Sequence, residues 1–466
     1  MKLLNPGRFV VEKSLLLIAF CLCGVIAGHA QSQPAAVAVT HYFTNNPDGA
    51  TPYTSLILGT DNSIYGCTSA GGTNDAGTVF KMNPDGSGYS VLYHFFPSEN
   101  GAGFPLELGP FVLRGRDGVL YGGTQDGSTY KDGVLFKLNT DGSGYAILHN
   151  FTDNVPSSLL QIDDGSLCGA GLQGIFKIDT DGGNYSMLHA FNISVDGRFA
   201  YGQLIQGTDG FLYGTAEAGG SNSLGTVFKL DTGGTNFTVL HTFGATNDGA
   251  KPYGGLIPGD NGALYGATSA GGTNGAGTVY RLNPDGGGYQ ILHHFQTNSA
   301  DGKNPFSQLT RGLNNLFYGT CVHGGATGNG TVYEIGTDGS GYQTVWSFPE
   351  SGTNGVFPYG GLVRGLSSGD VGTLYGMNEA GGRGSWGAVY ALVVNAPLTI
   401  TPALTTEGSN PVVLWPAWAV GYQVQTTTNL TNGAWTTVSN GVPVTGIQLT
   451  NVPSGSYYRL IWNSTN

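Results

Sequence analysis

A unit of about 52 residues recurs seven times in this 466-residue chain, and this repetition constrains the fold more than any other feature of the sequence. Each unit carries a Tyr-Gly pair, replaced by Cys-Gly in the third, and a Gly-x-Val-aromatic segment follows it. The pairs begin at Tyr65, Tyr121, Cys168, Tyr213, Tyr265, Tyr318 and Tyr375. A spacing of 45–57 residues is typical of blade-type repeats. The 80 glycines argue against long helices.

Each unit contains four short segments rich in β-formers and bounded by turn residues. In the fifth unit these segments are residues 255–257, 263–268, 277–282 and 289–295. Seven units of four strands predict an all-β fold, a seven-bladed β-propeller. A β-helix or another open solenoid is the alternative architecture for such a repeat.

The fourth strand decides between a closed ring and an open solenoid. It carries a Leu-His-x-Phe pattern, as at 240–243 and 292–295, but the seventh unit ends without a copy. A matching segment, 39–43, precedes the first unit. We therefore expect an N-terminal strand to complete the last blade and close the ring, a permutation for which an open solenoid has no use.

The repeat also resembles a known family. Residues 264–280, the turn Asn283-Pro-Asp-Gly286 and the motif Leu292-His-His-Phe295 are similar to the tandem GloVer repeat of exported bacterial choice-of-anchor proteins. The resemblance covers residues 37–394. It implies a secreted or surface-displayed protein with a variable C-terminal attachment module and no assigned biochemical activity. No terminal hydrophobic sorting anchor follows the repeats here, so covalent surface attachment is not expected.

The two ends of the chain lie outside the repeats. Residues 1–30 have the basic start, apolar run and small-residue site of a secretory signal peptide, and we expect the propeller to occupy residues 31–395. Residues 396–466 contain six or seven short strand candidates, which predict a small β-sandwich of fibronectin or immunoglobulin type that acts as a spacer or docking module. The mature chain is expected to have no membrane span and to be monomeric.

Charge and cysteine usage limit the partners. The net charge of −12 and the lack of a basic patch disfavour nucleic acid as a partner. Cys67, Cys168 and Cys321 fall in the first, third and sixth units, so they cannot all be neighbours, and we expect isolated buried thiols.

Ligand binding is expected on one face of the ring, the long-loop face, where the loops between strands two and three and between strand four and the next blade emerge. Five aromatic residues would form an arc there, at the entry to the innermost strands. They are Tyr53, Tyr201, Tyr253, Phe306 and Tyr359. Such rings could stack on sugars, or they could simply pack between blades. Blade three is short on this face, in 152–157 and 170–173, which would leave a notch in the rim.

Four ionisable residues depart from the repeat on the same face. Glu217 and Glu379 stand where other units have serine, His323 stands where they have alanine, and Glu350 lies between blades six and seven. If the protein is an enzyme, His323 with Glu350 and Glu379 could perform general acid–base catalysis. Glu217 lies three blades from Glu379, so the two cannot readily form a glycosidase carboxylate pair. Glu217 is a candidate ligand-binding residue. The alternative for all four is that they are solvated loop charges.

No metal site or cofactor is expected. Five blades place a histidine at one fourth-strand position, but these residues lie on different blades and cannot share one ion, so we expect a structural hydrogen-bonding role. They are His41, His149, His189, His241 and His293. The turn Asp179-Thr-Asp181-Gly182 resembles part of a calcium loop, and calcium there is a minor alternative.

Three functional hypotheses follow. The first is a secreted, non-catalytic propeller that binds a polysaccharide or a surface partner through its long-loop face. The second is a carbohydrate-active enzyme, a polysaccharide lyase or glycosidase, with its site on that face. The third is a structural envelope or matrix protein.

Overall fold

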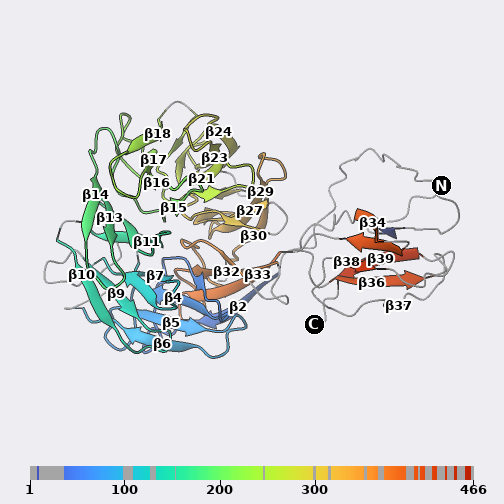
Figure 1. Ribbon diagram of the computed structural model, residues 1–466. Coiled ribbons are helices and arrows are strands. Elements are labelled where there is room, and N and C mark those ends of the chain that lie inside the picture. The colour runs from blue at the N-terminus through green and yellow to red at the C-terminus, as the bar shows by residue number, and fades with distance from the viewer. Residues whose placement is uncertain are drawn as a thin grey trace. The chain divides into compact units, whose positions relative to one another are not determined.

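Four-stranded antiparallel sheets repeat seven times around a common centre in the computed structural model (Figure 1). The structure describes residues 8–9, 36–97, 109–125, 133–152, 154–244, 247–297, 301–312, 316–350, 354–365 and 372–394, together with strand segments between 403 and 462. The chain divides into two compact units. One comprises residues 34–365 and 373–394 and contains the seven sheets.

Each of the first six blades runs from its innermost to its outermost strand in chain order. Blades one to three are β3 (Ile57–Leu58), β4 (Ile64–Thr68), β5 (Thr78–Met82) and β6 (Ser90–His94); β7 (Phe111–Arg114), β8 (Leu120–Gly123), β9 (Val134–Leu138) and β10 (Ala146–Asn150); and β11 (Pro156–Gln161), β12 (Leu167–Gly171), β13 (Gly174–Ile178) and β14 (Ser186–Ala190). Blades four to six are β15 (Ile205–Gln206), β16 (Leu212–Ala216), β17 (Thr226–Leu230) and β18 (Thr238–Thr242); β20 (Ile257–Pro258), β21 (Leu264–Thr268), β23 (Thr278–Leu282) and β24 (Gln290–His294); and β26 (Thr310–Arg311), β27 (Leu316–Cys321), β29 (Thr331–Gly336) and β30 (Gln343–Ser347).

The seventh blade joins the two ends of the repeat region. Its sheet has the order β2 (Ala36–Tyr42), β33 (Ala388–Val393), β32 (Thr373–Asn378) and β31 (Val363–Arg364). The N-terminal strand β2 pairs antiparallel with β33 from Ala36 to Tyr42, and the two lie side by side in Figure 1. The structure therefore confirms a closed seven-bladed propeller completed by an N-terminal strand.

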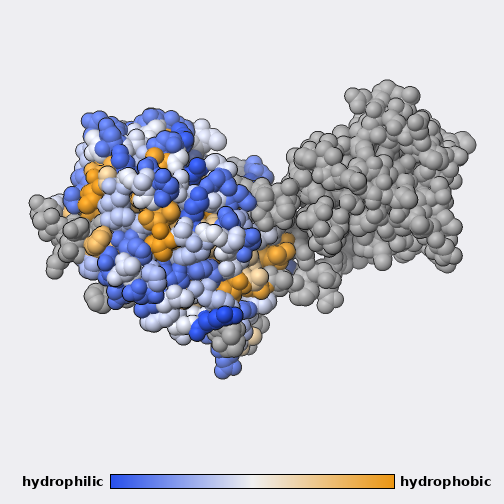
Figure 2. All heavy atoms as spheres, turned by 90° about the horizontal axis from the view of Figure 1, so that it is seen from below, coloured by the Kyte–Doolittle hydropathy of each residue, from blue (hydrophilic) through white to orange (hydrophobic). Residues whose placement is uncertain are grey.

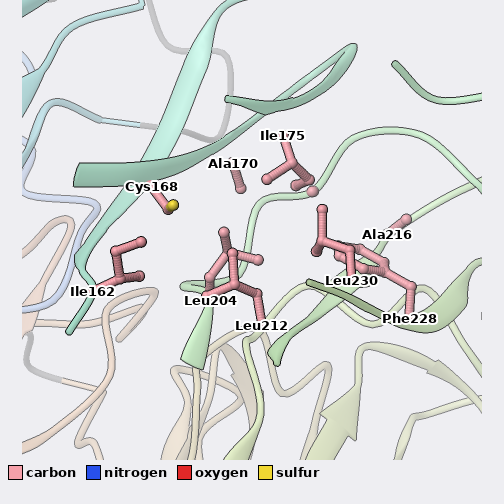
Figure 3. Packing of buried hydrophobic residues seen from close by; sticks show 10 residues of the cluster. Ile162, Cys168, Ala170, Ile175, Leu204, Leu212, Ala216, Phe228 and Leu230 are labelled. Carbon is pink, nitrogen blue, oxygen red and sulfur yellow. The ribbon is translucent and has the colours of Figure 1, made fainter. Parts of the chain in front are cut away.

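The hydrophobic core lies between blades. Seven clusters of buried residues each combine side chains from two neighbouring blades, and together they account for all seven interfaces. Figure 3 shows the interface of blades three and four, where Cys168 faces Leu204 and Leu212. The cluster around Phe43, Phe80 and Val389 joins blade seven to blade one. Closure of the ring thus buries apolar surface as well as pairing strands.

The three cysteines of the repeat region are buried, free thiols, as the sequence predicted. Burial raises the pKa of the Cys168 thiol to about 12 and raises that of Cys67 and Cys321 as well. These thiols therefore serve as small apolar groups in the core.

The other unit contains residues 1–33, 366–372 and 395–466. Its strands form two antiparallel sheets. One has the order β1 (Arg8–Phe9), β39 (Tyr457–Trp462), β36 (Tyr422–Thr427) and β37 (Thr436–Thr437), and the other has β34 (Ala403–Glu407), β35 (Asn410–Leu414) and β38 (Gly446–Gln448). Of the expected signal peptide, only Arg8 and Phe9 fall within the described residues. In the part of the chain that the structure describes, no helix is both long and apolar enough to cross a membrane.

Candidate functional site

The innermost strands surround a central cavity of about 260 Å³. All seven blades contribute to its wall, from the innermost strands and the residues that precede them. These strands pack with little space between their backbones, since an added Cβ at Gly254 would lie 2.4 Å from the carbonyl oxygen of Ser307. Glycines at such positions let adjacent blades converge on the axis.

The five aromatic residues singled out from the sequence line this cavity, and their side chains are half-buried. They are in contact with one another in a continuous arc. The ring centroids of Tyr53 and Tyr359 are 5.3 Å apart, those of Tyr359 and Phe306 5.5 Å, those of Phe306 and Tyr253 4.6 Å, and those of Tyr253 and Tyr201 4.6 Å. The aromatic arc therefore packs between blades and also forms part of the cavity wall.

A left-handed residue precedes each ring of the aromatic arc by two positions. These residues have φ between 51° and 63° although none is glycine; they are Thr51, Phe199, Lys251, Asn304 and Phe357. Threonine and phenylalanine rarely adopt this conformation, which costs on the order of 1–3 kcal/mol. The backbone is held on both sides: the Phe357 N–H donates to Asn329, and the Phe357 carbonyl accepts from the Glu379 N–H. The same pair of hydrogen bonds recurs at the other four positions.

The aromatic arc is interrupted at blades two and three. Gly109 and Pro156, both buried, stand at the corresponding positions, and Pro156 begins β11. Blade three is short as expected, because only Leu172 and Gln173 separate β12 from β13. Asn154 fixes this short loop by accepting a hydrogen bond from the Gln173 N–H at 2.8 Å.

The remaining lining side chains are uncharged, and two of them were not identified from the sequence. Gln203 and Gln308 each donate from Nε2 to the preceding blade, to the carbonyls of Leu159 at 3.0 Å and Leu256 at 2.6 Å. Ser55 accepts from the Gly361 N–H at 2.8 Å. The sequence held a signal for the glutamines, since glutamine alternates with glycine at the position two residues before the innermost strands of blades four to seven, as Gln203, Gly255, Gln308 and Gly361.

The ionisable residues predicted from the sequence lie around the rim and do not line the cavity. Glu379 accepts a hydrogen bond of 2.7 Å from the Tyr53 hydroxyl, so it supports the aromatic arc. Glu217 is buried and forms an ion pair of 3.1 Å with Lys251. Glu350 is exposed between blades six and seven.

His323 lies in the two-residue strand β28 (His323–Gly324), where it pairs in register with Lys303 of β25 (Gly302–Lys303). Its ring packs edge-on against Phe357, with the centroids 5.4 Å apart. Burial, and secondly the charge of Lys303, lower the pKa of His323. Phe357 thus connects His323 with Glu379, but among the described residues no hydrogen bond or ion pair joins the side chains of His323, Glu350 and Glu379.

The fourth-strand histidines have the structural role that the sequence predicted. Four of them pair through Nε2 with an aspartate in the loop that leads to the next blade, at 2.9–3.2 Å; the pairs are His41–Asp48, His189–Asp196, His241–Asp248 and His293–Asp301. Each of the five histidine rings stacks on an aromatic ring of the next blade at 3.5–3.8 Å. We refer to these contacts as the outer His–Asp pairs. Within the described residues, no group of three or more His, Cys, Asp or Glu side chains is placed to hold a metal ion.

The pKa is lowered at three of the paired aspartates, Asp48, Asp248 and Asp301. Burial raises the pKa of Asp48, Asp248 and Asp301, but the hydrogen bonds and charge of the paired histidines and the tyrosine and backbone donors outweigh it. The pKa of each carboxyl therefore lies below its usual value of 3.8.

Solved structures with the same architecture include several lyases. A streptogramin B lyase shares 15% identity, covers 78% of this chain and 98% of its own and gives a TM-score of 0.53. A catalytically inactive virginiamycin B lyase from Staphylococcus aureus, solved with quinupristin, shares 14% identity. The match covers 78% of this chain and 100% of the lyase, with a TM-score of 0.54. The extracellular domain of a hybrid two-component system of B. thetaiotaomicron shares 13% identity. The match covers 90% of this chain and 56% of that one, with a TM-score of 0.50. At such identities the likeness establishes the fold alone.

No curated protein matches the sequence. The family described as the Gloeobacter/Verrucomicrobia repeat matches residues 24–174, 112–328 and 168–390, which together span the propeller. The repeat identified in the sequence is thus the repeat of this family, and the chain belongs to the Gloeobacter/Verrucomicrobia repeat proteins.

Proposed function

We propose that this protein is a non-catalytic binding module that holds a polysaccharide at the long-loop face of its propeller. One observation carries the proposal: five aromatic rings from five different blades form a continuous arc on the wall of the central cavity. Aromatic faces stack on the apolar faces of sugar rings, and tyrosine adds a polar group at the ring edge.

Packing between blades accounts for the ring-to-ring contacts but not for the backbone that positions them. Ordinary apolar packing does not require a non-glycine residue in a left-handed conformation, yet one precedes the ring on all five blades, and on three of them it is threonine or phenylalanine. Strain of this kind is concentrated at functional sites. The hydrogen bond from Tyr53 to Glu379 further supports one end of the aromatic arc.

We also propose roles for the two segments that flank the propeller. Residues 1–30 serve as the export signal, and the mature propeller acts outside the cell as a monomer. Residues 396–466 form a β-sandwich of fibronectin or immunoglobulin type that attaches the propeller to its surroundings. The two antiparallel sheets of that unit support this assignment.

A retention and turnover assay on the exported chain tests the proposal. We expect retention by at least one polysaccharide in affinity electrophoresis, loss of retention in Tyr253→Ala, and no loss in Phe96→Ala, which removes an exposed ring that does not line the cavity. Depolymerisation that is abolished in His323→Ala would contradict the non-catalytic proposal and favour an enzyme. Retention that survives Tyr253→Ala would place binding elsewhere.

A further inference from the structure

Among the described residues, no charged side chain lines the central cavity. The residues that line it are aromatic, aliphatic, glycine, serine, threonine and glutamine. A carboxylate drawn from water into this wall would meet no cation, and burying an unpaired charge is strongly unfavourable. Lys251, two residues before the lining residue Tyr253, is not part of the lining and is paired with Glu217.

The polar groups of the wall have a defined hydrogen-bonding capacity. Gln203 and Gln308 use Nε2 to bond the neighbouring blades, and their Oε1 atoms accept no hydrogen bond within the described residues. Each carbonyl oxygen can accept from an O–H group. The Ser55 hydroxyl, whose oxygen accepts from Gly361, can still donate its proton. The wall thus offers acceptors and a donor of neutral type beside the aromatic arc.

We infer that the cavity takes an uncharged sugar residue and that it rejects uronates. The inference rests on the proposed polysaccharide-binding function and specifies its ligand. Apolar ring faces match the aromatic arc, hydroxyl groups match Oε1 of Gln203 and Gln308, and no lining residue that the structure describes carries a positive charge. Elimination by a polysaccharide lyase requires a proton made acidic by a neighbouring carboxylate, so a cavity that excludes uronates is unsuited to that reaction.

Titration calorimetry with three hexasaccharides tests the inference on the full mature chain. The probes are a neutral cello-hexasaccharide, a galacturono-hexasaccharide and a glucosamine hexasaccharide. We expect the neutral probe to bind at least about tenfold more tightly than the acidic one, with an affinity that does not change between low and high salt. The glucosamine probe shows whether the aromatic arc instead selects a cation.

Gln308→Lys is the decisive variant. Lysine retains a donor for the Leu256 carbonyl and introduces one positive charge into the wall. We expect this variant to bind the galacturonate probe at least as tightly as the neutral one and to make that binding salt-dependent. Gln203→Lys makes the same change at an exposed position and serves if Gln308→Lys does not fold.

The outcomes separate this inference from the proposed function. If the galacturonate or glucosamine probe binds the unmodified chain best and Tyr253→Ala abolishes that binding, the inference is wrong and the proposed binding site stands. If no probe and no polysaccharide binds, or if binding survives Tyr253→Ala, the proposed function itself is wrong.

Discussion

The outer His–Asp pairs and the central aromatic arc are both built from positions that recur in several blades, and they differ in how their side chains are used. On the outside, each aspartate is bound by a histidine and by backbone N–H groups, and the histidine ring is covered by an aromatic ring of the next blade. At the centre, the aromatic rings contact one another and also line a cavity.

This difference shows that repetition alone does not separate structure from function. The histidines and the aromatic residues each occupy one repeat position in five blades, and the histidines, whose number suggests a metal site, stack on rings of neighbouring blades. The two sets are distinguished by their contacts. The histidines and aspartates have their partners within the protein, as buried polar groups normally do, whereas the aromatic rings also face a cavity.

The largest effect is expected from the outer pairs. Asp248→Ala removes the acceptor of His241, Gly244, Gly249 and Tyr289 and leaves these buried and half-buried donors without it. We expect the free energy of unfolding to fall by about 3–5 kcal/mol, measured by chemical denaturation. Asp285→Ala removes an exposed turn aspartate and should cost no more than about 1 kcal/mol. Equal losses in the two variants would show that the outer pairs are ordinary surface contacts.

Lowering the pH should reduce the contribution of the same aspartates to stability. The folded-state pKa values of Asp48, Asp248 and Asp301 lie below 3.8, so the unfolded chain binds protons first as the pH falls. Their contribution to stability is therefore present above the unfolded value and is lost below about pH 4. We expect the melting temperature to fall from that pH downward, with a shallower decline in Asp248→Asn. A decline of the same slope in both proteins would contradict this explanation.

The aromatic arc should show the reverse behaviour, with a large effect on binding and a smaller one on stability. Tyr253→Ala removes ring contacts with Tyr201 and Phe306 and one part of the cavity wall. We expect polysaccharide affinity to fall at least about tenfold, whereas stability should fall by about 1–3 kcal/mol. Affinity electrophoresis and thermal melting measure the two quantities. If Tyr253→Ala lost as much stability as Asp248→Ala and no affinity, the aromatic arc would be structural too.

The smallest effect is expected at Asn378, whose side chain is fully buried. Neither of its polar atoms has a hydrogen-bond partner among the described residues. The equivalent Thr68 and Thr268 donate to the carbonyl two residues ahead. Asn378→Thr should let the new hydroxyl donate to Ala380 and raise the free energy of unfolding by about 1 kcal/mol. A destabilised variant in a melting experiment would show that Asn378 has a role that the threonines lack.

Much of the fold could be predicted because the repeat exposes the same pattern seven times. The segment 39–43 matched a missing fourth strand, and β2 does pair with β33. The membership of the aromatic arc followed from one position in the repeat. Its contacts could not be predicted, because they depend on how closely seven blades converge, and neither could the positive φ of Phe199 and Phe357, since phenylalanine carries no signal for it.

The ionisable residues were harder to place for a physical reason. Their departure from the repeat shows that each position is unusual, but it does not show which neighbour the side chain meets. Glu379 binds Tyr53 from the next blade, and Glu217 binds Lys251, so both carboxylates are engaged in contacts between blades. Gln203 and Gln308 line the cavity, and their alternation with glycine in blades four to seven was the one sequence signal for them.

A crystal structure of the mature chain with a neutral oligosaccharide would test the central claim most directly. The account predicts a sugar ring in the central cavity, in contact with at least one ring of the aromatic arc and with a hydroxyl group bound to Oε1 of Gln203 or Gln308. An oligosaccharide bound at the outer His–Asp pairs, with the central cavity holding only solvent, would contradict it.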